Sequence, residues 1–295
     1  MKVLNASEVE QFVEQGFVTI RDCVSAEVIV DWREWCFNRL GTTEAAAQSI
    51  LRGQEELPPV LSVDSALLAP RAYSAACDLV GGPEMLAGKW LWTDGFLVNS
   101  NPESDQPWTV PPPASESWHL DTHWYRCFLD SPEWAILCIV GWSDIGRHEG
   151  ATVVSPSSAK RVARYLYEHP EGVTGWPIQA LLGDNPDYKE LEMAAGDVTF
   201  VSRHLVHTAS PNLGPRPRII TRPALTLREP LRLGAGAGGR SPLEQMTLRA
   251  LGEVAADFQP RGGREALKYP HWEFYEMKSR TARESLKLRL DGAVE

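Results

Sequence analysis

Apolar positions recur at helical spacing along the part of the chain that precedes residue 89. The first helix is predicted to begin with the capping-box pair Ser7 and Glu10 and to end at Gly16. A short strand over Phe17–Ile20 follows it. Further helices are predicted from Ser25 to Leu40 and over the alanine-rich stretches 44–52 and 66–80.

From Lys89 the pattern changes to short segments rich in β-branched and aromatic residues, which are typical of strands. The predicted strands are Lys89–Val98, Glu133–Trp142, Ala151–Val154, Val198–Val201 and Ile219–Leu227. The run Trp134–Trp142 is apolar on both faces, which indicates a strand inside a closed or sandwiched sheet. Outside these strands we predict a loop over 101–116 and helices over Ser158–His169 and 271–290.

A helical N-terminal layer followed by many short strands predicts a mainly β protein. Its core would be a double-stranded β-helix (a cupin-like jelly-roll) with N-terminal and flanking α-helices. No linker is long enough to require a second domain, so we expect one domain over residues 1–295. Its parts would be a helical layer at about 1–88, the jelly-roll at about 89–230 and a helical extension at about 240–295. Jelly-roll strands converge on one mouth, where residues distant in sequence can meet.

Charge and composition limit the kinds of molecule that the protein is expected to bind. The net charge of −10 argues against nucleic acid, because phosphate binding needs concentrated Lys and Arg. No apolar run is long enough to span a membrane, and Met1–Asn5 lacks the apolar core of a signal peptide. We therefore expect a cytoplasmic protein that acts on a small molecule. The sequence specifies no oligomeric state, and its five cysteines, without a CxxC pair, indicate reduced structural thiols.

A candidate metal motif lies in the segment Trp118-His119-Leu120-Asp121. Residues two apart on a strand face the same side, so His119 and Asp121 can reach one ion. A 2-His-1-carboxylate facial triad needs such a pair and one further histidine, and it leaves positions open for cosubstrate and oxygen. The motif alone is weak evidence, since a histidine and an aspartate at this spacing arise by chance.

The missing histidine is expected further along the chain. After Gly196-Asp197, an apolar strand leads to His207, and a polar turn then leads to a strand that opens near Arg218. A guanidinium suits a carboxylate because its planar fork makes two parallel charge-assisted hydrogen bonds. A metal ligand at the end of one strand and an arginine at the start of the next would share one pocket.

Several short motifs thus follow one another along the chain: Trp118-His119-Leu120-Asp121, Glu149-Gly150, Gly196-Asp197, His207 and Arg218. Their order and spacing resemble the phytanoyl-CoA dioxygenase family of iron(II)- and 2-oxoglutarate-dependent oxygenases, over roughly residues 5–230. The resemblance implies that His119, Asp121 and His207 bind Fe(II) and that Arg218 binds the cosubstrate 2-oxoglutarate, with O2 as the second cosubstrate. Halogenating relatives need a small residue where the carboxylate would be, so Asp121 also implies oxygenation.

The chain departs from the family pattern at two places. Ser155-Pro156-Ser157-Ser158 stands where the family commonly has Pro-Gly-Ser-His. Ala209 stands where a hydroxyl residue usually follows the second histidine, and Ser210 or Thr221 is expected to replace that cosubstrate contact. Neither departure affects the metal triad.

Other residues compete for these roles. His123 could share a face with His119 and Asp121, although we expect it only to line the pocket. We favour His207 over His204 because Arg218 follows His207 at the family spacing, and Arg218 over Arg216.

Arg222 and the tryptophans leave two interpretations each. On a regular strand Arg222 would face the same way as Arg218 and could receive a substrate carboxylate, but it could also lie at the rim, which we favour. The eleven tryptophans, many of them between Trp90 and Trp142, fit either a tryptophan-rich core or an aromatic-walled pocket.

Together these features predict a 2-oxoglutarate-dependent non-heme iron dioxygenase. It would oxidise, and most simply hydroxylate, a C–H bond of a largely apolar small or medium metabolite, converting 2-oxoglutarate to succinate. Desaturation, ring closure, epoxidation and epimerisation use the same triad. The alternative is a non-redox cupin-type metal protein, an isomerase or small-molecule binder, which would give Arg218 no role.

Overall fold

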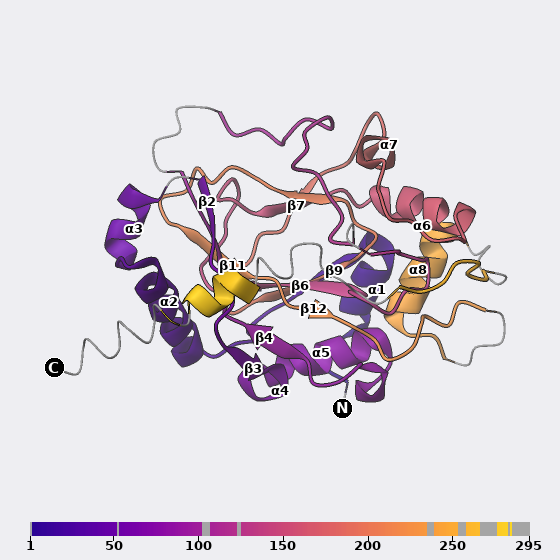
Figure 1. Cartoon of the computed structure of the whole chain (residues 1–295), viewed down its shortest axis with the longest axis horizontal. Coiled ribbons are helices and arrows are strands. Elements are labelled where there is room, and N and C mark those ends of the chain that lie inside the picture. Colours follow the sequence, from indigo (N-terminus) through magenta and orange to yellow (C-terminus); the bar gives the residue numbers. More distant parts are fainter. Residues whose placement is uncertain are drawn as a thin grey trace.

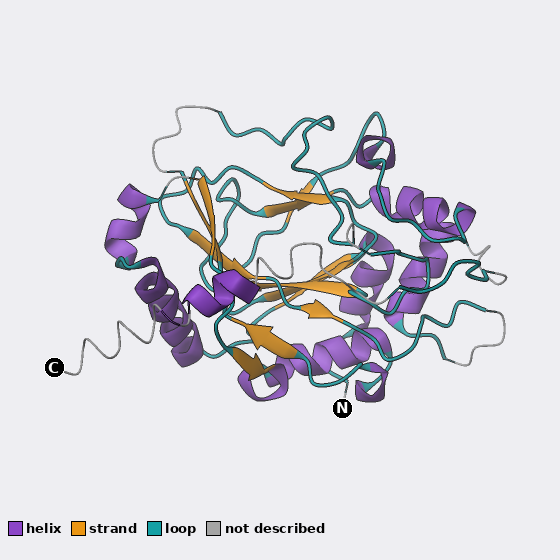
Figure 2. Ribbon diagram, in the orientation of Figure 1, coloured by secondary structure: helices purple, strands orange, loops and turns teal. Residues whose placement is uncertain are grey.

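The computed structural model describes residues 2–51, 53–101, 107–122, 125–234, 239–252, 258–265, 276–282 and 284. Two antiparallel sheets form its centre, and helices lie around them (Figures 1 and 2). The predicted jelly-roll core with flanking helices is therefore confirmed.

The larger sheet has seven strands, in the order β1-β9-β6-β11-β5-β2, with β12 also paired to β6. Their bounds are β1 Phe17–Ile20, β2 Gly53–Glu56, β5 Leu97–Ser100, β6 Ile136–Gly141, β9 Val198–Ser202, β11 Arg218–Thr221 and β12 Ala224–Leu225. A smaller sheet, in the order β10-β7-β8, consists of β7 Thr152–Val154, β8 Lys189–Glu190 and β10 His207–Ala209. Strands β3 Ser62–Asp64 and β4 Leu91–Thr93 form a separate pair.

Strand β6 shows why one segment of the sequence is apolar on both faces. It lies between β9 and β11, and all six of its residues are buried. Because side chains alternate along a strand, Leu137 and Ile139 face a cavity toward the smaller sheet, whereas Cys138 points to the opposite side. Trp142, just beyond the strand, stacks on Trp32 of a flanking helix with ring centroids 4.4 Å apart.

The helices are α1 Ala6–Gln15, α2 Ala26–Leu40, α3 Glu44–Ile50, α4 Ser65–Leu68, α5 Pro70–Val80, the 3-10 turn η1 Pro83–Met85, α6 Ser158–Glu168, α7 Ile178–Leu182 and α8 Pro242–Leu251. Those predicted from Ser25, over 44–52 and 66–80 and from Ser158 are present, apart from a break between α4 and α5. No helix within the described ranges is long and apolar enough to cross a bilayer.

The start of α1 differs from the prediction. Asn5, and not Ser7, is the N-cap, and it forms the capping box with Glu8. The reason is tertiary, because the carboxylate of Asp78 accepts hydrogen bonds from the backbone N–H groups of Val3 and Leu4 at 2.6 and 3.1 Å. These bonds fix the chain in place just ahead of Asn5, so the N-cap lies two residues earlier than the predicted Ser7.

Four strands have no counterpart in the sequence prediction, namely β2, β3, β8 and β10. Strand β2 is polar and exposed throughout, so it carries no apolar alternation. Its strand conformation comes from pairing with β5, where Gln54 lies opposite Asn99. Of the C-terminal helix predicted over 271–290, residues 276–282 and 284 are described and helical, and the rest lie outside the described residues. All five cysteines are buried and free, as expected of structural thiols.

Candidate metal centre and cosubstrate pocket

His119 and His207 lie side by side because their backbones pair with each other. The N–H of each donates to the carbonyl of the other at 3.0 Å, which forms an isolated antiparallel bridge. Their imidazole rings have centroids 4.4 Å apart. His207 opens β10 instead of ending the strand that follows Gly196, because that strand, β9, ends at Ser202 and the chain then crosses to the smaller sheet.

Both rings are oriented by a backbone carbonyl. Nδ1 of His119 lies 2.8 Å from the carbonyl oxygen of Ser117, and Nδ1 of His207 lies 3.0 Å from that of Leu205. A carbonyl can only accept, so each Nδ1 carries a proton, and Nε2 is the ring nitrogen that is left to bind a metal. Metal-binding histidines are commonly held in this way by a second group.

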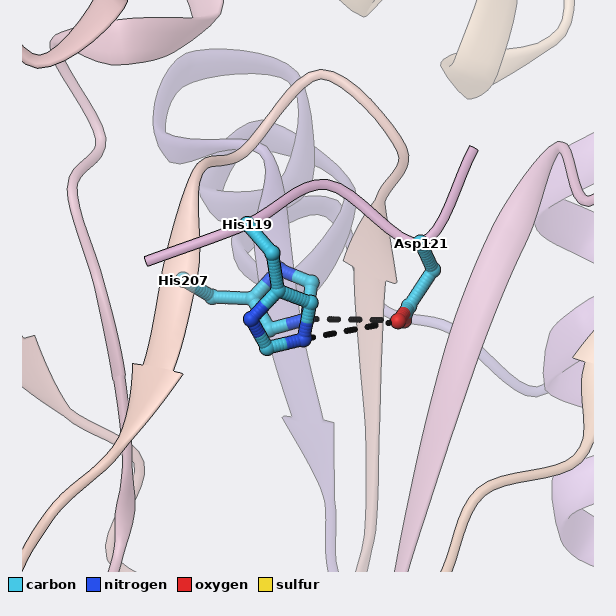
Figure 3. Close-up of side chains that lie close together, drawn as sticks. All are labelled: His119, Asp121 and His207. Carbon is cyan, nitrogen blue, oxygen red and sulfur yellow. Dashed lines mark ion pairs between the residues drawn. The ribbon is translucent and has the colours of Figure 1, made fainter. Parts of the chain in front are cut away.

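The carboxylate of Asp121 points at both rings (Figure 3). Asp121 lies in a turn and not on a regular strand, yet its Oδ1 is 3.5 Å from His119 Nε2 and its Oδ2 is 3.4 Å from His207 Nε2. The ligand atoms of the three side chains all lie within 4.8 Å of one another.

These residues fit a bound divalent cation. Asp121 Oδ2 and His207 Nε2 are buried and have no hydrogen-bond partner within the described part of the chain. Buried polar atoms without partners are uncommon in native proteins, and a bound ion is one of the usual reasons for them. Two imidazole nitrogens and one carboxylate oxygen form the donor set of the facial triad, which suits Fe(II).

The charge on Asp121 favours the same conclusion. Burial by itself would raise the pKa of this carboxyl group. The neighbouring His207 and His119, together with the charge of Arg222, outweigh burial and hold the pKa well below its usual range. Asp121 is therefore ionised at neutral pH, the form in which a carboxylate binds a metal.

Arg218 is a buried cation at the first position of β11. Only 2% of it is exposed, its Nε donates to the carbonyl of Gly150 at 2.9 Å, and its Nη1 has no partner among the described residues. Burial and the charge of Arg222 lower the pKa of Arg218 to about 9. A buried charge without a counter-ion lowers the stability of the fold. The position of Arg218 therefore indicates a binding site for an anionic ligand.

One cavity connects this arginine with the histidines. It lies between the two sheets, with a volume of about 390 Å³ counted with its open mouth. Its lining residues are Gln54, Leu97, His119, Leu137, Ile139, Thr152, His207, Thr208, Ala209, Arg218, Ile220 and Arg222. A molecule with carboxylates at both ends could therefore reach Arg218 with one end and the histidines with the other.

The tryptophans belong mainly to the core. Trp90, Trp92, Trp118 and Trp142 are buried, and no described tryptophan lines the cavity. Of the two interpretations of the tryptophan-rich segment, the structure supports a tryptophan-rich core, and Trp124 lies outside the described residues.

The structure does not bring Thr221 or Ser210 to the cavity. The hydroxyl of Thr221 accepts a hydrogen bond from Trp142 Nε1 at 3.0 Å, on the face of β11 opposite to Arg218. Ser210 donates to the carbonyl of Ala151 at 2.8 Å. The predicted replacement of the cosubstrate hydroxyl by either residue therefore has no support in this geometry.

Replacing Thr221 by valine tests this assignment. The change keeps the shape of the side chain but leaves the buried Trp142 Nε1 without an acceptor, which should lower the free energy of unfolding by about 1–3 kcal/mol. Because the cavity wall is untouched, the KM for 2-oxoglutarate should stay unchanged. Urea denaturation and cosubstrate titration measure the two effects. A raised KM for 2-oxoglutarate with an unchanged free energy of unfolding would show that Thr221 contacts the cosubstrate after all.

The other residues considered as metal or carboxylate ligands lie in different parts of the structure. His204 is fully buried beside Arg203 and does not belong to the cluster of possible metal ligands. Arg216 lies at the surface, 3.6 Å from Asp144. His123 is outside the described residues. Among the alternatives that the structure describes, Arg222 alone lines the cavity.

Sequence reasoning missed Gln54 and Thr152, which also line the cavity. Gln54 could not be found because its strand, β2, has no apolar pattern. Thr152 offered a signal, because it follows the Glu149-Gly150 turn at the start of a predicted strand.

The fold is an antiparallel jelly-roll, and its cavity brings together two histidines, a carboxylate and a buried arginine. This combination is typical of a metal-dependent enzyme that binds a small carboxylate. The family model of phytanoyl-CoA dioxygenase matches residues 12–220, which is more than half of the chain. The protein belongs to the phytanoyl-CoA dioxygenase family. It is thus a 2-oxoglutarate-dependent non-heme iron enzyme, with Fe(II) as its metal and 2-oxoglutarate and O2 as cosubstrates.

Solved structures give more distant similarities. The carbocyclase SnoK from nogalamycin biosynthesis is 19% identical, with 81% of this chain and 91% of SnoK covered and a TM-score of 0.49. EctD from S. alaskensis in its apoform is 17% identical, with 76% and 78% covered and a TM-score of 0.48. HygX from Streptomyces hygroscopicus with nickel and 2-oxoglutarate bound is 17% identical, with 81% and 95% covered and a TM-score of 0.45. No curated protein matches the sequence.

Proposed function

We propose that the protein oxidises a C–H bond of a small or medium organic metabolite, most simply by hydroxylation, within a single domain formed by the whole chain. One oxygen atom of O2 enters the product and the other enters succinate, as 2-oxoglutarate loses carbon dioxide. Bound Fe(II) supplies the redox chemistry that activates O2. His119, Asp121 and His207 hold the iron in this proposal.

The buried guanidinium of Arg218, whose Nη1 has no partner among the described residues, is the observation that carries the proposal. It shares a cavity with the histidines, and it lies too deep to be a solvated surface charge. The distal carboxylate of 2-oxoglutarate would accept hydrogen bonds from Arg218 and remove the cost of the buried charge. A non-redox cupin-type metal protein would leave this arginine unexplained.

The other residues of the cavity orient the substrate and limit water. The side of the cavity formed by the larger sheet is aliphatic and consists of Leu97, Leu137, Ile139 and Ile220. This wall favours a substrate with an apolar body. Gln54 and Thr152 add polar groups that can fix the orientation of the substrate.

Oxygen consumption tests the proposal directly. The purified full chain with Fe(II), ascorbate and a metabolite extract should consume O2 and form succinate only when 2-oxoglutarate is present, as measured by an oxygen electrode and NMR. Removing the metal with a chelator should stop both, and added Fe(II) should restore them. Glutarate, which lacks the 2-oxo group, is the matched control. Metal binding without any 2-oxoglutarate consumption would favour the non-redox alternative.

A further inference from the structure

Arg222 lies in the same cavity as Arg218 but nearer to solvent. It follows β11, and the alternation of side chains places Arg218, Ile220 and Arg222 along one face, all lining the cavity. The Arg222 side chain is 34% exposed, whereas Arg218 is almost fully enclosed. The cavity thus has one cation at depth and a second nearer its mouth.

Arg222 makes only one weak ion contact with the residues that the structure describes. Arg222 Nη1 is 4.0 Å from Asp121 Oδ1, at the outer limit of an ion pair, and its guanidinium makes no hydrogen bond to any residue that the structure describes. The oxygens of Asp121 already face His119 Nε2 and His207 Nε2, and a metal ion between them would occupy the carboxylate. The described lining of the cavity offers Arg222 no other carboxylate.

The charges of the loaded site leave Arg222 unmatched. Two negative charges on 2-oxoglutarate and one on Asp121 balance the two positive charges of Fe(II) and the one on Arg218. The charge of Arg222 remains, in a cavity whose other lining residues are five aliphatic residues, the two histidines, Arg218 and three uncharged polar residues. A negative group on the substrate would complete the balance, and a planar carboxylate matches the guanidinium fork.

We propose that Arg222 binds a carboxylate of the primary substrate, which makes that substrate an organic acid with an apolar body. The inference rests on the proposed function, since it assumes that 2-oxoglutarate occupies Arg218. The 4.0 Å separation of Arg222 from Asp121 also places the acid group close to the metal, so the oxidised C–H bond lies within a few bonds of that group.

Binding to an inactive complex tests the proposal without turnover. The full chain is loaded with Ni(II), which does not support oxidation, and with saturating 2-oxoglutarate. Hexanoate and the neutral, similarly shaped hexanamide are then titrated by ligand-observed NMR. Hexanoate should bind at least about tenfold more tightly than hexanamide, because an arginine–carboxylate contact in a partly enclosed site exceeds a neutral one by that factor.

Variants assign the preference to one residue. Arg222→Gln should remove the preference for hexanoate and leave the affinity for 2-oxoglutarate within about twofold of the original. Arg222→Lys should keep part of the preference, since it retains the charge but not the fork. Arg216→Gln is the matched control, because it removes an equal charge from a surface arginine paired with Asp144, and it should change nothing.

The opposing outcomes are distinct. Equal binding of hexanoate and hexanamide to the unmodified protein, or a preference that survives Arg222→Gln, would overturn the proposal. A loss of 2-oxoglutarate affinity in Arg222→Gln would instead assign Arg222 to the cosubstrate and also overturn it. Tighter binding of hexyl phosphate than of hexanoate would contradict the carboxylate assignment. Failure of the unmodified Ni(II) protein to bind 2-oxoglutarate would refute the proposed function itself, and this inference with it.

Discussion

Replacing His207 by alanine is expected to abolish 2-oxoglutarate turnover while the protein stays folded. The variant loses one of three metal ligands, and its Fe(II) affinity should fall by more than about 100-fold, because even groups that only orient a ligand contribute 10–100-fold. The fold loses one hydrogen bond, from His207 Nδ1 to the carbonyl of Leu205, which contributes about 1 kcal/mol. Metal titration and thermal unfolding measure the two effects, and Asp121→Ala and His119→Ala should behave alike.

Two further histidines complete this experiment. His169 lies at the end of α6, outside the metal site, so His169→Ala is the control for the general effect of removing an imidazole. This variant should retain full metal affinity. His204 is the competitor for the role of distal ligand. If His204→Ala loses the metal while His207→Ala keeps it, the assignment of the distal ligand is wrong.

Replacing Arg218 should have opposite effects on cosubstrate binding and on stability. Arg218→Met should raise the KM for 2-oxoglutarate by at least about 30-fold, since leaving one partner of a buried charge pair alone costs about 2 kcal/mol or more. Arg218→Lys should have a smaller effect, because lysine keeps the charge but loses the planar fork. The KM should change more than kcat, since the contact is made before the reaction as well as during it.

The ligand-free Arg218→Met protein, in contrast, should be more stable than the original. Burying an unpaired charge costs several kcal/mol. The hydrogen bond to the carbonyl of Gly150, which the variant loses, contributes only about 1 kcal/mol, so removal of the charge dominates. Denaturation without 2-oxoglutarate checks the sign. An unchanged KM in both Arg218→Met and Arg218→Lys would move the carboxylate site to Arg222, the other arginine that lines the cavity.

The sequence by itself determined the features that depend on local periodicity. Strand β6 could be placed inside a sheet because it is apolar on both faces, and α2 could be started at Ser25 because a serine that caps a helix acts on its own first turn. The two-residue spacing of His119 and Asp121 indicated a pair of metal ligands, and the alternation along β11 already put Arg222 on the face of Arg218. The prediction of Thr221 as a cosubstrate contact did not take this alternation into account, since Thr221 lies on the opposite face of the strand.

Tertiary structure decided what depends on distant parts of the chain. His207 meets His119 through a backbone bridge that joins segments far apart in sequence, and it does so only because the chain changes sheets after β9. Strand β2 owes its conformation to pairing with β5, since its own residues are polar and exposed. Asp78 set the start of α1 by binding backbone N–H groups ahead of it. Periodicity describes how a segment presents its faces, whereas the partner of each face is selected by packing of the whole chain, which no local pattern encodes.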